Sequence, residues 1–183
     1  MLDTRETILT LARATAQAHG YGGLSFRELA KAVGIKSASI HYHFPTKADL
    51  GAALARRYTA DAAAALAGIA EATPKPAKRL RRYTDIFRRA LEHDNPMCLA
   101  SYMAAEYDDL PDAVKQEVAA FANLNIAWLT DVLIPIDTKA AKARAHAIYA
   151  AIGGAQLGAR TRNHAALYDD IIETYRKTGL IPD

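Results

Sequence analysis

Polar and aromatic side chains gather in the short segment 37–43, which carries Ser39, His41 and Tyr42. Hydroxyl and imidazole groups donate hydrogen bonds to phosphate oxygens and to acceptors on the edges of DNA bases. His41 and His43 lie two residues apart, so on a helix they point in different directions and make a poor pair of metal ligands. The residue types and their spacing therefore favour contact with nucleic acid over metal binding.

Two short helices and a turn are predicted to position these side chains. Ser25 and Glu28 have the spacing of a capping box, which fixes the start of the first helix, and Gly34 can adopt the positive φ that ends it. Ser37 is expected to cap the second helix, which Pro45 stops. Two helices joined by a short glycine-containing turn form a helix-turn-helix, whose second helix can enter the major groove of DNA.

A family resemblance is carried by the segment from Gly34 to Leu50, which contains an aromatic residue followed by His-Phe-x-x-Lys-x-x-Leu. This segment resembles the signature of the TetR family of bacterial transcriptional regulators. The chain departs from the family pattern at Ala38, where glycine is common, and at His41, where the first of two aromatic residues is usual. Ala38 is a better helix former than glycine. His41 offers an imidazole in place of a phenol, so the operator sequences of relatives are not expected to transfer.

The resemblance implies an all-α fold. A DNA-binding helix-turn-helix domain of three helices, residues 1–47, would be joined by a long helix to a C-terminal effector-binding and dimerisation domain, residues 48–183. It also implies a homodimeric repressor that binds a palindromic operator in double-stranded DNA and is released by a small-molecule effector. Carried over residue by residue, the expected DNA contacts are Lys36, Ser37, Ser39, His41, Tyr42 and Lys47, and Arg27 is a further basic side chain within reach of phosphate.

The composition sets limits on the whole chain. Its 183 residues are 51% hydrophobic and 8% aromatic with abundant alanine, which favours helices over sheet. The formal net charge is +3, so a nucleic-acid footprint must be local. No apolar run approaches the roughly 20 residues that span a bilayer. The N-terminus also lacks an apolar signal core, and a single cysteine fits a reducing compartment. We therefore expect a cytoplasmic protein with no membrane partner.

An effector cavity is expected on the inner faces of the C-terminal helices. Asn125 interrupts an apolar stripe, and a buried amide costs about 1–3 kcal/mol unless it is hydrogen-bonded. It either pairs with a neighbouring helix or points into a cavity. A pocket of mainly apolar and aromatic groups suits a small, mostly apolar molecule. The side chains expected to line it are Cys98, Tyr102, Met103, Phe121, Asn125, Trp128 and His146, although each could also be ordinary core.

Small residues repeat at helical spacing in the segment 143–158. Such a stripe lets another helix approach closely, and the resemblance implies that the last two helices of two subunits form a four-helix bundle. The expected dimer interface comprises Ala147, Ala151, Gly154, Gly158, Leu167, Ile171 and Tyr175. Packing within one chain is the alternative interpretation of the glycine stripe.

Three alternatives to an effector-released repressor can be weighed from the sequence. Cys98 begins a predicted helix with basic residues nearby in sequence, which could make it a redox- or electrophile-sensing thiol, but cysteine usually behaves as a small buried hydrophobe. An enzyme is not expected, because the chain has no glycine-rich phosphate loop, nucleophile elbow or metal-spaced cluster. Accordingly, no catalytic residue, metal or cofactor is assigned. A helical interaction module that has lost DNA binding is the third possibility.

Overall fold

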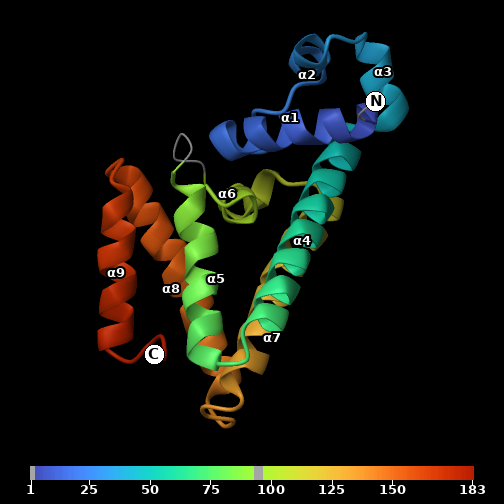
Figure 1. The fold of residues 1–183 in the computed structure, drawn as a ribbon. Helices are drawn as coiled ribbons and strands as arrows, with labels where there is room; N and C mark the ends of the chain where they lie inside the picture. The colour runs from blue at the N-terminus through green and yellow to red at the C-terminus, as the bar shows by residue number, and fades with distance from the viewer. Residues whose placement is uncertain (1–2, 93–96) are drawn as a thin grey trace. The chain divides into compact units, whose positions relative to one another are not determined.

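The computed structural model describes residues 3–92 and 97–183, and the described chain is built from helices without strands (Figure 1). This confirms the all-α fold expected from the sequence. In order, the elements are α1 (Thr4–His19), α2 (Phe26–Val33), α3 (Ser37–His43), α4 (Lys47–Ala72), α5 (Pro76–Ala90), α6 (Leu99–Ala105), the 3-10 turn η1 (Tyr107–Asp109), α7 (Asp112–Leu133), α8 (Ala141–Thr161) and α9 (Ala165–Lys177).

The chain divides into two compact units. The first unit consists of Met1–Ala60 and Leu99–Phe121, and the second of Asp61–Cys98 and Ala122–Asp183. α4 and α7 each contribute residues to both units. The first unit thus includes α6 and the start of α7 beside the N-terminal helices. The domain boundary placed at residue 47 from the sequence stays a prediction.

Local capping explains where the N-terminal helices begin and end. The carboxylate of Asp3 accepts a hydrogen bond from the Arg5 N–H at 3.1 Å, which satisfies a free donor at the start of α1. Gly34 ends α2 with a φ of 80°, as predicted. Before α4, the Thr46 N–H donates to the Asp49 carboxylate at 2.9 Å, and the Asp49 N–H donates to the Thr46 hydroxyl at 3.1 Å. This pair is a complete capping box.

Two of the predicted caps differ in the structure. The Ser25 hydroxyl accepts from the Glu28 N–H at 3.4 Å, but the Glu28 carboxylate pairs with the Arg27 guanidinium at 3.2 Å. The expected cap by Ser37 is wrong, because the N-cap of α3 is Lys36 and no side chain caps this helix. Ser37 is instead the first helical residue, and its hydroxyl is left for other contacts.

The first unit buries a single apolar cluster. Ile8 on α1, Leu29 on α2, Ile40 on α3 and Leu50 on α4 are all buried in it. α6 and α7 complete the cluster with Met103 and Val114, among others. Burying one side chain of this size stabilises the fold by about 1.5–3 kcal/mol relative to leaving it exposed. α3 is thereby held on the unit through one face.

The second unit is organised around Tyr83 on α5. Its hydroxyl donates to the Asn125 side-chain oxygen at 3.0 Å, and its ring stacks on Trp128 at 5.4 Å between centroids. Asn125 therefore pairs with a neighbouring helix, which confirms one of its two interpretations. Burial raises the pKa of Tyr83 well above its usual value, and neighbouring Tyr149 and Cys98 raise it further.

Candidate nucleic-acid interface

The helix-turn-helix consists of α2, the turn at Gly34 and α3. Ile40 and Phe44 are 0% and 2% exposed, so one side of α3 is anchored in the core. Opposite them, Tyr42 is 84% exposed. A short helix with a buried apolar anchor and an exposed aromatic side chain can insert into a groove without unfolding its own core.

Most of the predicted DNA contacts lie on or beside α3. Lys36, Ser37, His41 and Tyr42 are exposed, and Ser39 is half-buried. Arg27 lies on α2, where its side chain is 89% exposed and pairs with Glu28. An exposed ion pair of this kind contributes about 0–1 kcal/mol and leaves the guanidinium free to move.

The His41 ring is held in place by two contacts. Its Nδ1 lies 3.3 Å from the Pro45 carbonyl oxygen, within hydrogen-bond distance. The Phe26 ring from α2 meets it edge-on, with centroids 4.7 Å apart and an interplanar angle of 64°. Of its polar atoms, Nε2 is the one that neither contact uses.

The Lys47 ammonium makes two contacts within the chain. It donates to the Gly22 carbonyl oxygen at 3.1 Å and lies 4.8 Å from the centre of the Tyr21 ring. Lys47 is half-buried, so it stabilises the loop between α1 and α2. Its role as a DNA contact stays a prediction.

Sequence reasoning missed Glu106, which follows α6 and binds the same loop. Its carboxylate accepts hydrogen bonds from the Tyr21 N–H at 2.6 Å and from the Gly22 N–H at 3.1 Å. Gly20, with a φ of 73°, lies so close that a Cβ there would come within 2.4 Å of the carboxylate. The partners are 85 and 84 residues apart, so no local pattern announces them. The loop before α2 is thus fixed from two sides by opposite charges.

The predicted effector residues are divided between the two units, and their role in binding an effector stays a prediction. Tyr102, Met103 and Phe121 belong to the first unit, whereas Cys98, Asn125, Trp128 and His146 belong to the second. Phe121 stacks on Tyr58, with 5.2 Å between their centroids. The inward position expected for His146 is wrong, because it is exposed on α8 while Ala145 and Ile148 fill the buried face.

Cys98 is buried, with 2% of its surface exposed. Its backbone N–H donates to the Gln156 side-chain oxygen at 3.2 Å, and the Gln156 amide donates to the Phe87 carbonyl oxygen at 3.1 Å. Gln156 is a second residue that the sequence did not single out. It fixes the chain entering α6 against α5, and the thiol lies in packed surroundings.

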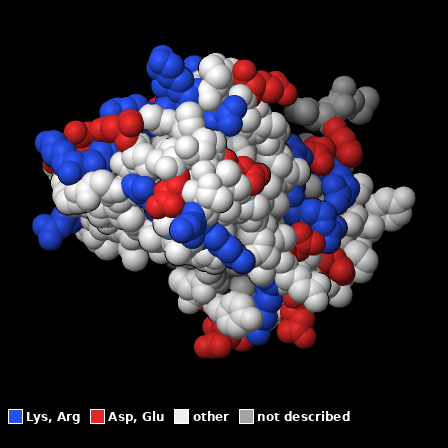
Figure 2. All heavy atoms as spheres, turned by 90° about the horizontal axis from the view of Figure 1, so that it is seen from below, with Lys and Arg blue, Asp and Glu red and all other residues white. Residues whose placement is uncertain are grey.

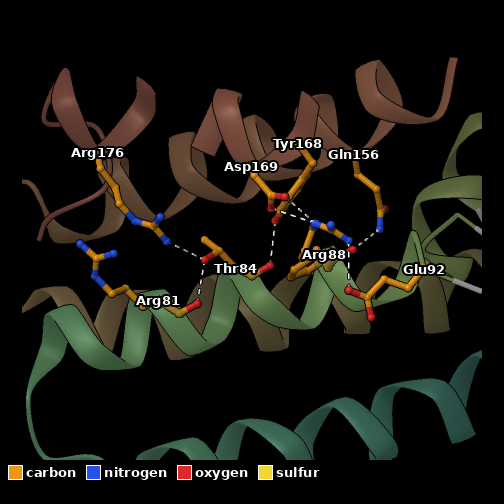
Figure 3. Close-up of polar contacts among 9 residues, drawn as sticks. Arg81, Thr84, Arg88, Glu92, Gln156, Tyr168, Asp169 and Arg176 are labelled. Carbon is orange, nitrogen blue, oxygen red and sulfur yellow. Dashed lines mark hydrogen bonds and ion pairs between the residues drawn. The ribbon is translucent and has the colours of Figure 1, made fainter. Parts of the chain in front are cut away.

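Figure 3 shows how α5 and α9 of the second unit are joined by polar contacts. Arg88 donates from Nε to both Asp169 oxygens at 2.8 and 2.9 Å. Tyr168 donates to the Thr84 carbonyl oxygen at 2.9 Å, and Arg176 donates to the Thr84 hydroxyl at 2.9 Å. Burial raises the pKa of Tyr168, with a further rise from Asp85. These contacts fasten α9 to α5, and the Nε of Arg176 is buried there without a hydrogen-bond partner among the described residues.

Surface clefts border α5 among the described residues of this unit. One, of about 710 Å³, lies between the second half of α4 and α5 and has apolar Ile69 and Ile86 beside Arg82 and Arg89. Another, of about 300 Å³, lies over the polar contacts between α5 and α9. None of the seven predicted effector residues lines either cleft.

The predicted dimer residues lie outside the buried face of α8. Ala147 and Gly154 are exposed, and Ala151 and Gly158 are half-buried. No atom lies within 4 Å of a Cβ built on Gly154, and the nearest to one on Gly158 is Ile171 Cδ1 at 3.9 Å. Packing within this chain therefore does not require glycine at Gly154. On α9, Leu167, Ile171 and Tyr175 are all half-buried.

On the face in Figure 2, lysine and arginine side chains are interspersed with aspartate and glutamate. Across residues 3–92 and 97–183, no three metal-binding side chains come together. Within the same residues, every helix is too short or too polar to cross a membrane.

An all-α chain that begins with a helix-turn-helix and exposes the second helix of this motif has the fold of helical transcription regulators. The sequence model of bacterial regulatory proteins of the tetR family matches residues 8–54. The chain is similar to a TetR transcriptional regulator from Legionella pneumophila, with 31% identity over 97% of this chain and 98% of that one, and a TM-score of 0.91. It is similarly close to a TetR-family regulator from Agrobacterium tumefaciens, with 31% identity over 96% of both chains and a TM-score of 0.90. The chain belongs to the TetR family of transcriptional regulators.

More distant structures share the fold. NemR of E. coli in its reduced form aligns with 96% of this chain and 96% of its own, at 21% identity and a TM-score of 0.82. At this identity the likeness concerns the fold alone. Among curated proteins, none matches the chain.

Proposed function

We propose that this chain represses transcription in the cytoplasm by binding a palindromic operator as a homodimer. The observation that carries the proposal is α3, anchored by Ile40 and Phe44 and exposing Tyr42 beside Lys36 and His41. Side chains on such a helix contact base edges, and basic groups at its start contact phosphates. The family membership supports the same assignment.

The dimer is proposed to form through α8 and α9. The exposed stripe at Ala147 and Gly154 leaves room for a second helix, and Leu157 beside it is 51% exposed. An isologous contact of this kind generates a two-fold axis. Two recognition helices would then address half-sites separated by one helical turn, about 34–36 Å, or a multiple of it.

Release by a small-molecule effector is also part of the proposal. α4 is one continuous helix from Lys47 to Ala72, so it begins beside the helix-turn-helix and ends in the second unit. The cleft of about 710 Å³ borders its second half at Ala65, Gly68 and Ile69. A ligand that binds the second unit better in one position of α4 would shift the population toward that position.

Selection of bound duplexes from a random-sequence pool tests DNA binding. We expect wild-type protein to enrich a palindrome, and Tyr42→Ala and Lys36→Ala to weaken binding to it by at least about tenfold, or about 1.4 kcal/mol. Lys78→Ala, on the exposed surface of α5, is the matched control and should bind like wild type. The proposal would be refuted if no sequence became enriched in the pool, or if wild type and the three variants bound the duplex with equal affinity.

A further inference from the structure

The His41 imidazole differs from a phenol because the hydrogen-bonding role of each ring nitrogen depends on which nitrogen carries the proton. A carbonyl oxygen only accepts hydrogen bonds, so a hydrogen bond across the 3.3 Å contact with the Pro45 oxygen is donated by the Nδ1–H tautomer. The Phe26 ring packs edge-on against the imidazole, with 4.7 Å between the ring centroids. In the Nδ1–H tautomer, the neutral imidazole carries a bare Nε2, which accepts hydrogen bonds, and Nε2 donates only in the imidazolium form.

DNA offers Nε2 far more acceptors than donors. Phosphate oxygens, guanine N7 and O6, adenine N7 and thymine O4 all accept, while adenine N6 and cytosine N4 are the donors of the major groove. The phosphates also surround the groove with negative charge, which favours a cation. The neutral form of His41 is thus poorly matched to most contacts that α3 could make.

We propose that His41 contacts the operator as an imidazolium, donating from Nε2 to a phosphate oxygen or a purine acceptor, so that each chain takes up a proton when it binds. The inference rests on the proposed function and specifies the chemistry of one contact. The phenol usual at this position in the family donates in its neutral form. Proton uptake is therefore a consequence of the histidine in this chain.

In the DNA-free protein, no carboxylate among the described residues forms a hydrogen bond or ion pair with the His41 ring. From α2 to the first turn of α4, the other ionisable side chains are Arg27, Glu28, Lys31, Lys36, Tyr42, His43, Lys47 and Asp49, and Arg5 of α1 lies over the Phe44 ring. Glu28 pairs with Arg27, and Asp49 caps the start of α4. Neither carboxylate bonds the imidazole, so DNA must supply the negative charge that stabilises the cation.

The sign of the pH dependence follows from linkage. The complex binds more protons than the free components, so affinity rises as pH falls wherever the free ring is neutral and the bound ring charged. In that window the slope of log affinity against pH approaches about −1 per chain.

The test uses the duplex selected by wild-type protein and measures its affinity by fluorescence anisotropy between about pH 6 and pH 8 at constant salt. We expect affinity to increase toward low pH for wild type and for the matched control His43→Gln. In His41→Gln and His41→Tyr, whose donors are neutral, the slope attributable to this residue should disappear. A second readout is a long-range proton–nitrogen NMR spectrum of the free protein, in which His41 should carry its proton on Nδ1.

The outcomes separate this inference from the proposed function. Specific binding whose pH slope is the same in wild type and His41→Gln would overturn the proton-linked contact and leave the regulator intact. A proton on Nε2 in the free neutral protein would overturn its premise. Absence of specific binding at every pH would refute both proposals.

Discussion

The contact between Glu106 and the loop before α2 makes a sharp prediction about stability. Replacing Glu106 with alanine removes the acceptor of two backbone hydrogen bonds, from the Tyr21 N–H at 2.6 Å and the Gly22 N–H at 3.1 Å. A hydrogen bond to a charged group contributes about 1.5–3 kcal/mol when it is shielded from water. The Tyr21 bond is partly buried and the Gly22 bond is exposed, so water replaces the second at little cost.

The expected loss is therefore about 2 kcal/mol in the free energy of unfolding, mostly from the Tyr21 bond. For a chain of this size that corresponds to a fall of about 4–8 °C in Tm. Glu106→Gln keeps one acceptor oxygen but points an amide donor at the other N–H, so its loss should be intermediate. Amide hydrogen exchange at Tyr21 and Gly22 should accelerate in both variants.

Urea unfolding of the variants, followed by circular dichroism, supplies the assay. Asp108→Ala is the matched control, because this exposed carboxylate lies in the same turn and makes no hydrogen bond or ion pair among the described residues. It should change stability by less than about 0.5 kcal/mol. If Glu106→Ala were as stable as Asp108→Ala, the reasoning that this carboxylate fixes the loop would be refuted.

Three further predictions concern the second unit. Tyr83→Phe removes the donor to the Asn125 oxygen and should lower the free energy of unfolding in urea by about 1–3 kcal/mol. The double change Tyr83→Phe and Asn125→Leu should cost less than the sum of the two single changes. Strict additivity would argue against coupling between these two side chains. Gly154→Arg should convert the proposed dimer to a monomer in light scattering without unfolding the chain in circular dichroism, because no neighbouring atom of the described residues lies within 4 Å of a Cβ built there. An unaffected dimer would exclude this face as the interface. The raised pKa of Tyr168 means that the folded state keeps a proton which the unfolded state loses above about pH 10, so stability should fall as pH rises beyond that value. Tyr168→Phe should lessen this fall, and an equal fall in both proteins would contradict the assigned pKa direction.

Short-range rules predicted the structure well where the controlling residues are neighbours. Gly34 ends α2 with the predicted positive φ, and the Ser25 hydroxyl accepts from the Glu28 N–H three residues on. Ser37 fails as a cap because Lys36 occupies the N-cap position, one residue earlier than the pattern suggested. Predictions of this kind shift by a residue where no strong cap is present.

Long-range polar contacts were beyond the reach of the sequence. Glu106 and Gln156 bind backbone groups between 58 and 85 residues away, and nothing in their own segments distinguishes them from surface residues. Asn125 was noticed because it interrupts an apolar stripe, but its partner Tyr83 was not identifiable. His146 was assigned to the inner face of a helix whose buried positions are set by packing against other elements.

The central claim is that α3 reads a specific DNA sequence. The most direct measurement is the equilibrium affinity of wild-type protein for its selected duplex and for a scrambled duplex of equal length and composition, at two salt concentrations. We expect specific binding to be tighter by a factor of about 10³ or more, with affinity falling steeply as salt rises because several phosphates are contacted. Equal affinity for the two duplexes would contradict it.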